Sequence, residues 1–218
     1  MFKKINSLFL RLRNNRARKN EMKRKEILAT LPQNSFAKKL YSHENLNIEI
    51  GLLKIGSKVI NISKTRNKRT VSLDLDLLNR LSKTEDLRKA IFIHTHILGN
   101  VNRPKSANFS PMDFLTFIDY CHKFGISKFE LTLLNKNLIE MGRIQIIFSP
   151  EFIEAIQKGD IEKIKNWARS LAYKQAMSPN KVSIIEELKK QNTQIKYVSL
   201  NGYKLEEINN VPYISKSR

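Results

Sequence analysis

Two of the chain's four histidines lie two positions apart, where the apolar run "AIFIHTH" ends on His94 and His96. In a β-strand, residues i and i+2 point to the same face of the sheet, so the two imidazoles should project together. Two imidazoles on one side can share a metal ion. Zinc in a catalytic site usually takes three protein ligands and keeps one position for water, so this pair needs a third ligand.

Asp113 is the nearest candidate for that ligand, in the stretch "SPMD" that begins at Ser110. The same four residues fit a capping box, in which Ser110 is the N-cap and a carboxylate at the third helical position bonds back to it. A histidine pair and a helix cap are each common structural features, but their conjunction favours a site. We predict that Asp113 faces His94 and His96 rather than the Ser110 amide.

These stretches, together with "EIGLLKIG" starting at Glu49, resemble the JAMM motif of the JAB/MPN metalloproteases, which combines an upstream glutamate, His-x-His and Ser-x-x-Asp. The resemblance implies that His94, His96 and Asp113 bind zinc. It also implies that Glu49 accepts a proton from a water molecule at the metal and that Ser110 helps to hold the developing oxyanion. Each role has a chemical reason, because a nearby carboxylate can move the proton and a hydroxyl donor favours a tetrahedral intermediate.

The resemblance implies a zinc-dependent hydrolase of peptide or isopeptide bonds. A protein is then the expected substrate, and the flexible tail of a ubiquitin-like or sulfur-carrier protein is one candidate. The segment between His96 and Ser110 is longer than in the family. Because it borders the expected metal, we predict that it acts as a lid or selects the substrate.

The periodicity of the chain predicts an α/β (α+β) fold in which a mixed sheet is flanked by helices, as in JAB/MPN domains. Two strands should meet at a tight turn near Gly56, and the basic "KTRNKR" after them should be a loop. Leucines at helical spacing predict a helix over 74–90, followed by the histidine strand. A helix should then run from "SPMD" to Gly125, with strands near 128–135 and 142–150 after it.

The carboxyl-terminal third is predicted to be a helical insertion over about 151–191, followed by a closing hairpin over 194–208. Asp160 can cap one of the insertion's helices, and Asn201-Gly202 is a strong turn signal between two strands. Cys121 lies in an apolar helical stripe, which favours a place in the core over a role as nucleophile.

Charge divides the chain into a basic arm, residues 1–28, and a domain over 29–218. Of the net charge of +20, Met1 to Lys25 carries +9, with Glu21 as its only acidic residue. Such an arm can contact nucleic acid or a ribonucleoprotein, lie on an anionic membrane surface, act as a transit peptide or stay a solvated tail. A basic nucleic-acid-binding protein with a silent metal site is therefore the rival function.

Two further features concern the compartment. A single cysteine rules out an internal disulfide, which favours the reduced cytoplasm as the default location, while the basic arm is also compatible with targeting to an organelle. No apolar stretch reaches the roughly 18 residues that would predict a transmembrane segment.

Overall fold

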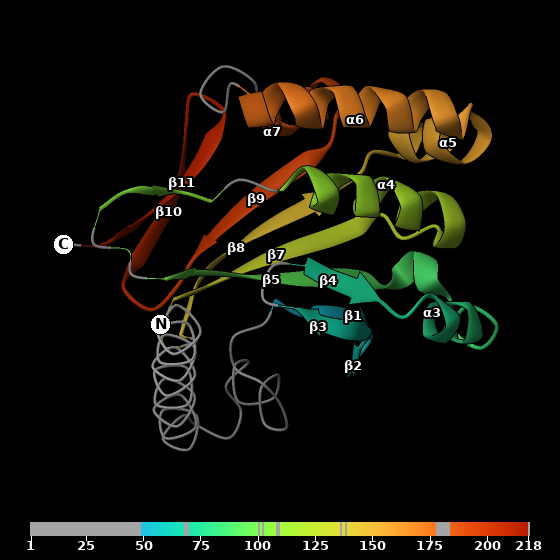
Figure 1. Cartoon of the computed structure of the whole chain (residues 1–218), viewed down its shortest axis with the longest axis horizontal. Coiled ribbons are helices and arrows are strands. Elements are labelled where there is room, and N and C mark those ends of the chain that lie inside the picture. Colours follow the sequence, from blue (N-terminus) through green and yellow to red (C-terminus); the bar gives the residue numbers. More distant parts are fainter. Residues whose placement is uncertain are drawn as a thin grey trace, which may run out of the picture.

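The computed structural model describes residues 49–67, 70–99, 101, 103–107, 110–135, 137, 139–177 and 184–217. Strands and helices are mixed along this part of the chain, with a six-stranded sheet covered by helices and a smaller sheet beside it (Figure 1). The predicted α/β (α+β) class is confirmed. The interpretations for residues 1–48, including the basic arm, lie outside the described residues.

The six-stranded sheet carries the histidines and runs in the order β2-β1-β5-β7-β8-β9. Strands β5 and β7 are parallel, and the other neighbours in this sheet are antiparallel. Its strands are β1 (Gly51–Ile55), β2 (Lys58–Asn61), β5 (Ile91–Gly99), β7 (Lys128–Asn135), β8 (Glu140–Ile147) and β9 (Gln194–Ser199). The predicted turn between β1 and β2 is confirmed, and Gly56 takes a φ of +56° there, which a residue without Cβ adopts at low cost.

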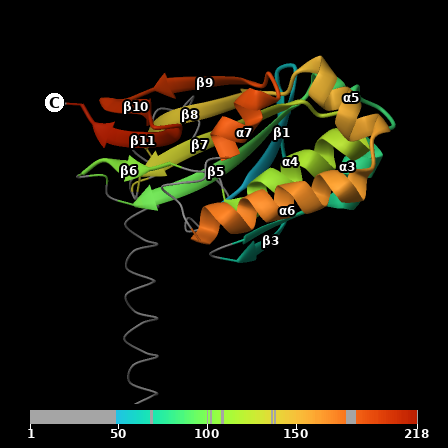
Figure 2. The same cartoon turned by 90° about the horizontal axis from the view of Figure 1, so that it is seen from above.

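Helices cover one face of this sheet (Figures 1 and 2). The ring of Phe92 on β5 packs edge-on against Phe117 of the helix above, and Phe117 stacks on Phe129 of β7 at 4.4 Å between centroids. Two further helices pack against that first one, so a single core joins sheet and helices. The helices are α3 (Leu75–Leu81), α4 (Pro111–Phe124), α5 (Pro150–Lys158), α6 (Ile161–Met177) and α7 (Ile184–Lys190).

Helix α4 follows its sequence prediction closely. It begins after Ser110 and ends at Gly125, whose φ of +69° is the left-handed conformation expected of a glycine at a helix end. Cys121 is buried in the core, as predicted, and burial raises the pKa of its thiol to about 12. The thiol therefore stays protonated at neutral pH, which removes it as a nucleophile.

The smaller sheet ties the end of the described chain to the segment between the second histidine and α4. Its order is β10-β11-β6, formed by β10 (Tyr203–Ile208), β11 (Val211–Lys216) and the short β6 (Lys105–Ser106). The predicted hairpin over 194–208 is wrong in its pairing, because β9 pairs with β8 while β10 pairs with β11. The turn at Asn201-Gly202 is present, but it passes the chain from one sheet to the other.

Three other predictions need correction. The stretch "KTRNKR" is not a plain loop, since β3 (Ser63–Asn67) pairs with β4 (Thr70–Leu73). The helix over 74–90 stops at Leu81, because the hydroxyls of Ser82 and Thr84 bond to carbonyls of the last turn and a separate 3-10 turn, Leu87–Lys89, follows. Helix α5 lies within the predicted helical insertion, but its separate start after Ser149 was not predicted, although Ser149 before Pro150 is an ordinary start signal.

None of the helices in the described part of the chain is both long and apolar enough to span a bilayer.

Candidate metal site

Strand β5 presents the two histidines from the middle of the sheet. Their side chains lie on the same face as Phe92, toward α4, and are only 10% and 12% exposed for His94 and His96. Their ring centroids are 4.9 Å apart and the rings are nearly perpendicular. The prediction that they project together is confirmed.

Helix α4 brings Asp113 to the histidines through its first turn. The carboxylate contacts both rings, with Oδ1 2.7 Å from Nδ1 of His94 and Oδ2 3.1 Å from Nε2 of His96. The capping box is also complete, because the Ser110 amide donates to Asp113 Oδ2 at 2.7 Å and the Asp113 amide donates to Ser110 Oγ at 3.1 Å. Asp113 faces both histidines, as predicted, but the expectation that it would not bond back to the Ser110 amide is wrong, since one carboxylate serves both the helix cap and the histidines.

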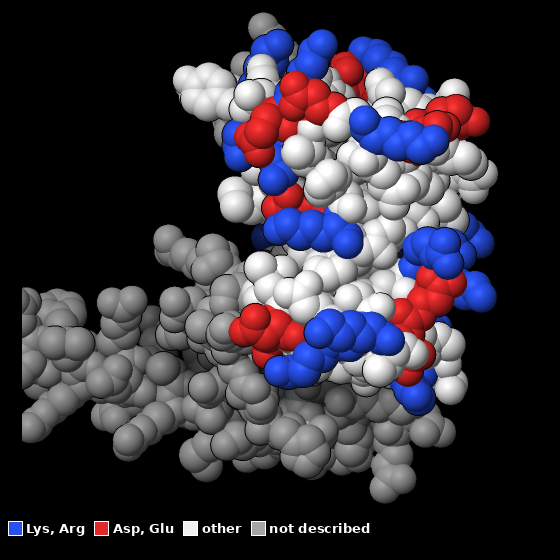
Figure 3. Space-filling view, turned by 90° about the vertical axis from the view of Figure 1, so that its right-hand side faces the viewer, with Lys and Arg blue, Asp and Glu red and all other residues white. Residues whose placement is uncertain are grey.

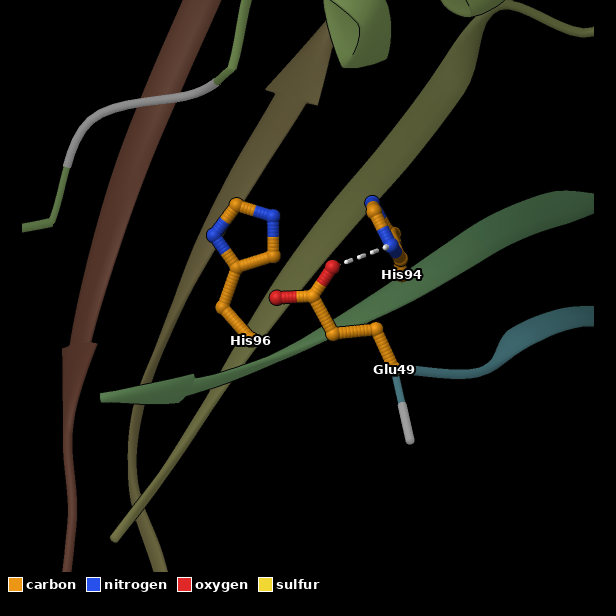
Figure 4. A group of neighbouring side chains, drawn as sticks. All are labelled: Glu49, His94 and His96. Atoms are coloured by element: carbon orange, nitrogen blue, oxygen red, sulfur yellow. Dashed lines mark ion pairs between the residues drawn. The ribbon is translucent and has the colours of Figure 1, made fainter. Parts of the chain in front are cut away.

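Glu49 approaches from the chain that leads into β1. In the antiparallel pairing of β1 with β5, Gly51 lies opposite His94. Glu49, two residues before Gly51, therefore falls opposite His96 when this register is continued. Glu49 Oε2 lies 3.8 Å from Nε2 of His94, and its carboxylate points between the two rings (Figure 4). Ligand atoms of Glu49, His94 and His96 all lie within 4.8 Å of one another, so this group could hold a metal ion.

The pKa values of the two carboxylates, Asp113 and Glu49, are shifted in opposite directions. Burial acts to raise the pKa of Asp113, but the hydrogen bonds from His94 and His96 outweigh it and hold that pKa below its ordinary value. For Glu49, burial is the larger effect and raises the pKa despite the nearby histidines. Burial acts to lower the pKa of His96, yet the hydrogen bond and charge of Asp113 raise it overall.

An unpartnered nitrogen supports a metal here. His94 Nδ1 is taken by Asp113, whereas Nε2 is buried and has no hydrogen-bond partner, at a distance from Glu49 that is too long for a hydrogen bond. A buried ring nitrogen without a partner is costly unless something binds it. Two imidazoles and two carboxylates are a donor set that zinc accepts, so the residues fit the predicted metal.

Ser110 lies at the edge of this group as the N-cap of α4. Its Oγ accepts the Asp113 amide, which leaves the hydroxyl proton available to another acceptor. All five predicted site residues therefore belong to one region, where the chain before β1, the middle of β5 and the start of α4 meet.

Two contributors to this region were not predicted. Thr95 lies between the histidines and bonds to Ile50, the residue after Glu49, through both its hydroxyl and its amide. A polar residue inside an apolar strand was the available signal for it. The pairing of β6 with β11 had no sequence signal, because β6 contains only two residues.

Comparison with known proteins returned no matching family model, no matching curated protein and no matching solved structure. The resemblance to JAB/MPN enzymes therefore rests on the five site residues and the order of the elements that carry them.

Proposed function

We propose that the protein is a zinc-dependent hydrolase of peptide or isopeptide bonds. The observation that carries this proposal is the buried, unpartnered Nε2 of His94, which faces Glu49, while Asp113 bonds to Nδ1 of the same ring and His96 lies beside it. A purely structural cluster would be expected to satisfy that nitrogen, whereas a metal site leaves it for the ion.

The proposed mechanism gives each site residue a separate role. The resemblance implies that His94 and His96 would hold zinc together with Asp113, whose lowered pKa keeps it ionised at neutral pH. As the side chains lie, Asp113 bonds to Nδ1 of His94, and the ligand atoms that converge are those of Glu49, His94 and His96. Zinc, when bound, would make a water molecule more acidic and polarise the carbonyl of the substrate. Glu49, with its raised pKa, suits proton transfer.

In the proposed reaction the oxygen of water bonds to the carbonyl carbon and its proton passes to Glu49. The bond from carbon to nitrogen then breaks, and Glu49 returns the proton to the leaving amine. The Ser110 hydroxyl donates to the oxyanion while the tetrahedral intermediate exists.

A protein tail is the proposed substrate, with ubiquitin-like and sulfur-carrier proteins as candidates. The segment that joins β5 to α4 connects His96 to Ser110 and contains β6, so it is the proposed lid or substrate-selecting element.

The proposal is tested by metal content and turnover of the same preparation. We expect about one zinc per chain, hydrolysis of a peptide-linked or isopeptide-linked ubiquitin-like conjugate, loss of turnover with chelator and recovery with zinc. His96→Ala should abolish zinc binding. His122→Ala is the matched control, because His122 lies on α4 and bonds to the Ile156 carbonyl. Equal zinc uptake by the two variants would contradict the proposal.

A second candidate, a nucleic-acid or ribonucleoprotein binding function, is favoured by the charge of +20. On the face in Figure 3, however, basic and acidic groups of the described residues lie side by side. The described part of the chain also contains ion pairs such as Lys58–Glu85 and Lys158–Glu154. If the protein has this function, the full chain should bind RNA or DNA with an affinity that falls steeply as the salt concentration rises and that does not change when chelator is added.

A further inference from the structure

The hydroxyl of Thr95 lies on the opposite face of β5 from the histidines and is bound to the chain beside Glu49. Thr95 is fully buried, its Oγ1 accepts the Ile50 amide at 2.8 Å, and its own amide donates to the Ile50 carbonyl at 3.1 Å. Both backbone polar groups of Ile50 are thus held by one residue that stands between His94 and His96.

The next anchor along the chain is Ser63. Its Oγ accepts the Gly51 amide at 2.9 Å, and Gly51 is where β1 begins. Glu49 lies before both anchors, so its distance from the imidazoles depends on how firmly Ile50 is held. Removing the Thr95 hydroxyl would leave the Ile50 amide buried without its acceptor, which favours displacement of this segment.

We propose that Thr95 is a positioning residue that sets the Glu49 carboxylate against His94 and His96 through Ile50. This inference rests on the proposed function and extends it, because it assigns to the middle residue of "HTH" the alignment of the proton-transfer group. A displacement of about 1 Å at a reacting group can lower turnover by as much as 100-fold.

Thr95→Val tests the proposal, since valine keeps the shape and removes the hydroxyl. We expect kcat to fall roughly 10- to 100-fold with KM little changed and zinc retained. Thr95→Ser, which keeps the hydroxyl, should restore most of kcat. The matched control is Thr132→Val, because Thr132 lies opposite Thr95 on β7, is equally buried and bonds to Glu130 instead.

A double variant shows whether Thr95 acts through Glu49. In a Glu49→Gln background, Thr95→Val should lower kcat no further, because the group that it positions has already lost its function. A full, additive loss in that background would overturn the proposal, as would equal kcat values for Thr95→Val and Thr132→Val.

A readout independent of activity separates this inference from the proposed function. Hydrogen exchange of the Ile50 amide in metal-free protein should be about 10-fold faster in Thr95→Val than in wild type and unchanged in Thr132→Val. If wild type neither binds zinc nor hydrolyses a conjugate, the proposed function fails and this exchange still tests the Thr95 anchor. Unchanged exchange in Thr95→Val would overturn the anchor even in an active enzyme.

Discussion

The chain before β1 and the first turn of α4 each deliver one carboxylate to the same pair of imidazoles, but they hold it very differently. Asp113 is 6% exposed and is bound by two ring nitrogens and the Ser110 amide. The side chain of Glu49 is 28% exposed, and its nearest ring nitrogen lies 3.8 Å away. One carboxylate is fixed from several sides, and the other has room to exchange a proton.

This difference shows how similar groups acquire separate tasks from their surroundings. Donors around Asp113 stabilise its ionised form and lower its pKa, whereas Glu49 has a raised pKa because burial dominates there. Pairs of titratable groups whose environments push their pKa values apart are typical of sites that divide acid–base work. Under the proposed function, Asp113 on α4 would bind the metal and Glu49 before β1 would transfer protons, although Glu49 also lies close enough to both histidines to hold the ion.

Replacing Asp113 should have the largest effect. We expect Asp113→Asn to weaken zinc binding by more than about 100-fold, to reduce turnover to background and to lower the free energy of unfolding of metal-free protein by about 2 kcal/mol, because an amide cannot accept from all three donors. Zinc titration and chemical denaturation measure the two effects. Asp119→Asn is the control, since Asp119 pairs with Lys165 elsewhere on α4. Normal zinc affinity in Asp113→Asn would assign the metal to other ligands.

Glu49→Gln tests the role of the second carboxylate. We expect kcat to fall by about 10²- to 10⁴-fold with zinc retained, because the amide cannot accept a proton from water. Steady-state kinetics with metal analysis checks this, with Glu151→Gln on α5 as a control. A loss of zinc as large as in Asp113→Asn would make Glu49 a metal ligand, as its closeness to both histidines permits.

Ser110→Ala should have a smaller effect on stability and a separable effect on turnover. Loss of the cap is expected to lower the free energy of unfolding by about 1 kcal/mol. If Ser110 also holds the oxyanion, kcat should fall by about 10²- to 10³-fold. Ser149→Ala removes the equivalent cap of α5, where Oγ accepts the Phe152 amide. Equal kcat values for the two variants would restrict Ser110 to capping.

The smallest expected effect is on how the free energy of unfolding of metal-free protein changes with pH. Because folding lowers the pKa of Asp113, the ionised group stabilises the fold above its unfolded pKa of about 4, and this contribution declines as pH falls below that value. The gap in unfolding free energy between wild type and Asp113→Asn should therefore narrow below about pH 4. Denaturation in chelator at several pH values measures it, and a gap that widens toward acid would contradict the described contacts.

Local chemistry made much of this region predictable. The cap at Ser110, the end at Gly125 and the shared face of His94 and His96 depend on residues close in sequence, and each was predicted correctly. The pairing of β10 with β11 was not, because Asn201-Gly202 specifies a turn and not the sheet that the next strand joins. Strand partners are chosen by contacts across the whole fold, which periodicity does not encode.

The same limit applies within the site. Glu49 meets His96 through the register of β1 on β5, and the anchor that fixes this register joins residues 45 positions apart. The roles of the two carboxylates also depend on burial and hydrogen bonds that residue types do not reveal. The sequence motif predicted which residues come together, and their different pKa values follow from the burial and hydrogen bonds around each one.

The pairing of β6 with β11 has a consequence for the order in which the molecule can assemble. The residues of the candidate metal site, Glu49 to Asp113, are synthesised early, but Ser106 pairs with Tyr213, which is synthesised more than 100 residues later. Contacts between such distant segments form late because closing a long loop costs entropy before the contact can offset it. The histidines and Asp113 can thus meet before β6 has its partner strand, so the pairing of β6 with β11 is expected to be among the last contacts to form during synthesis.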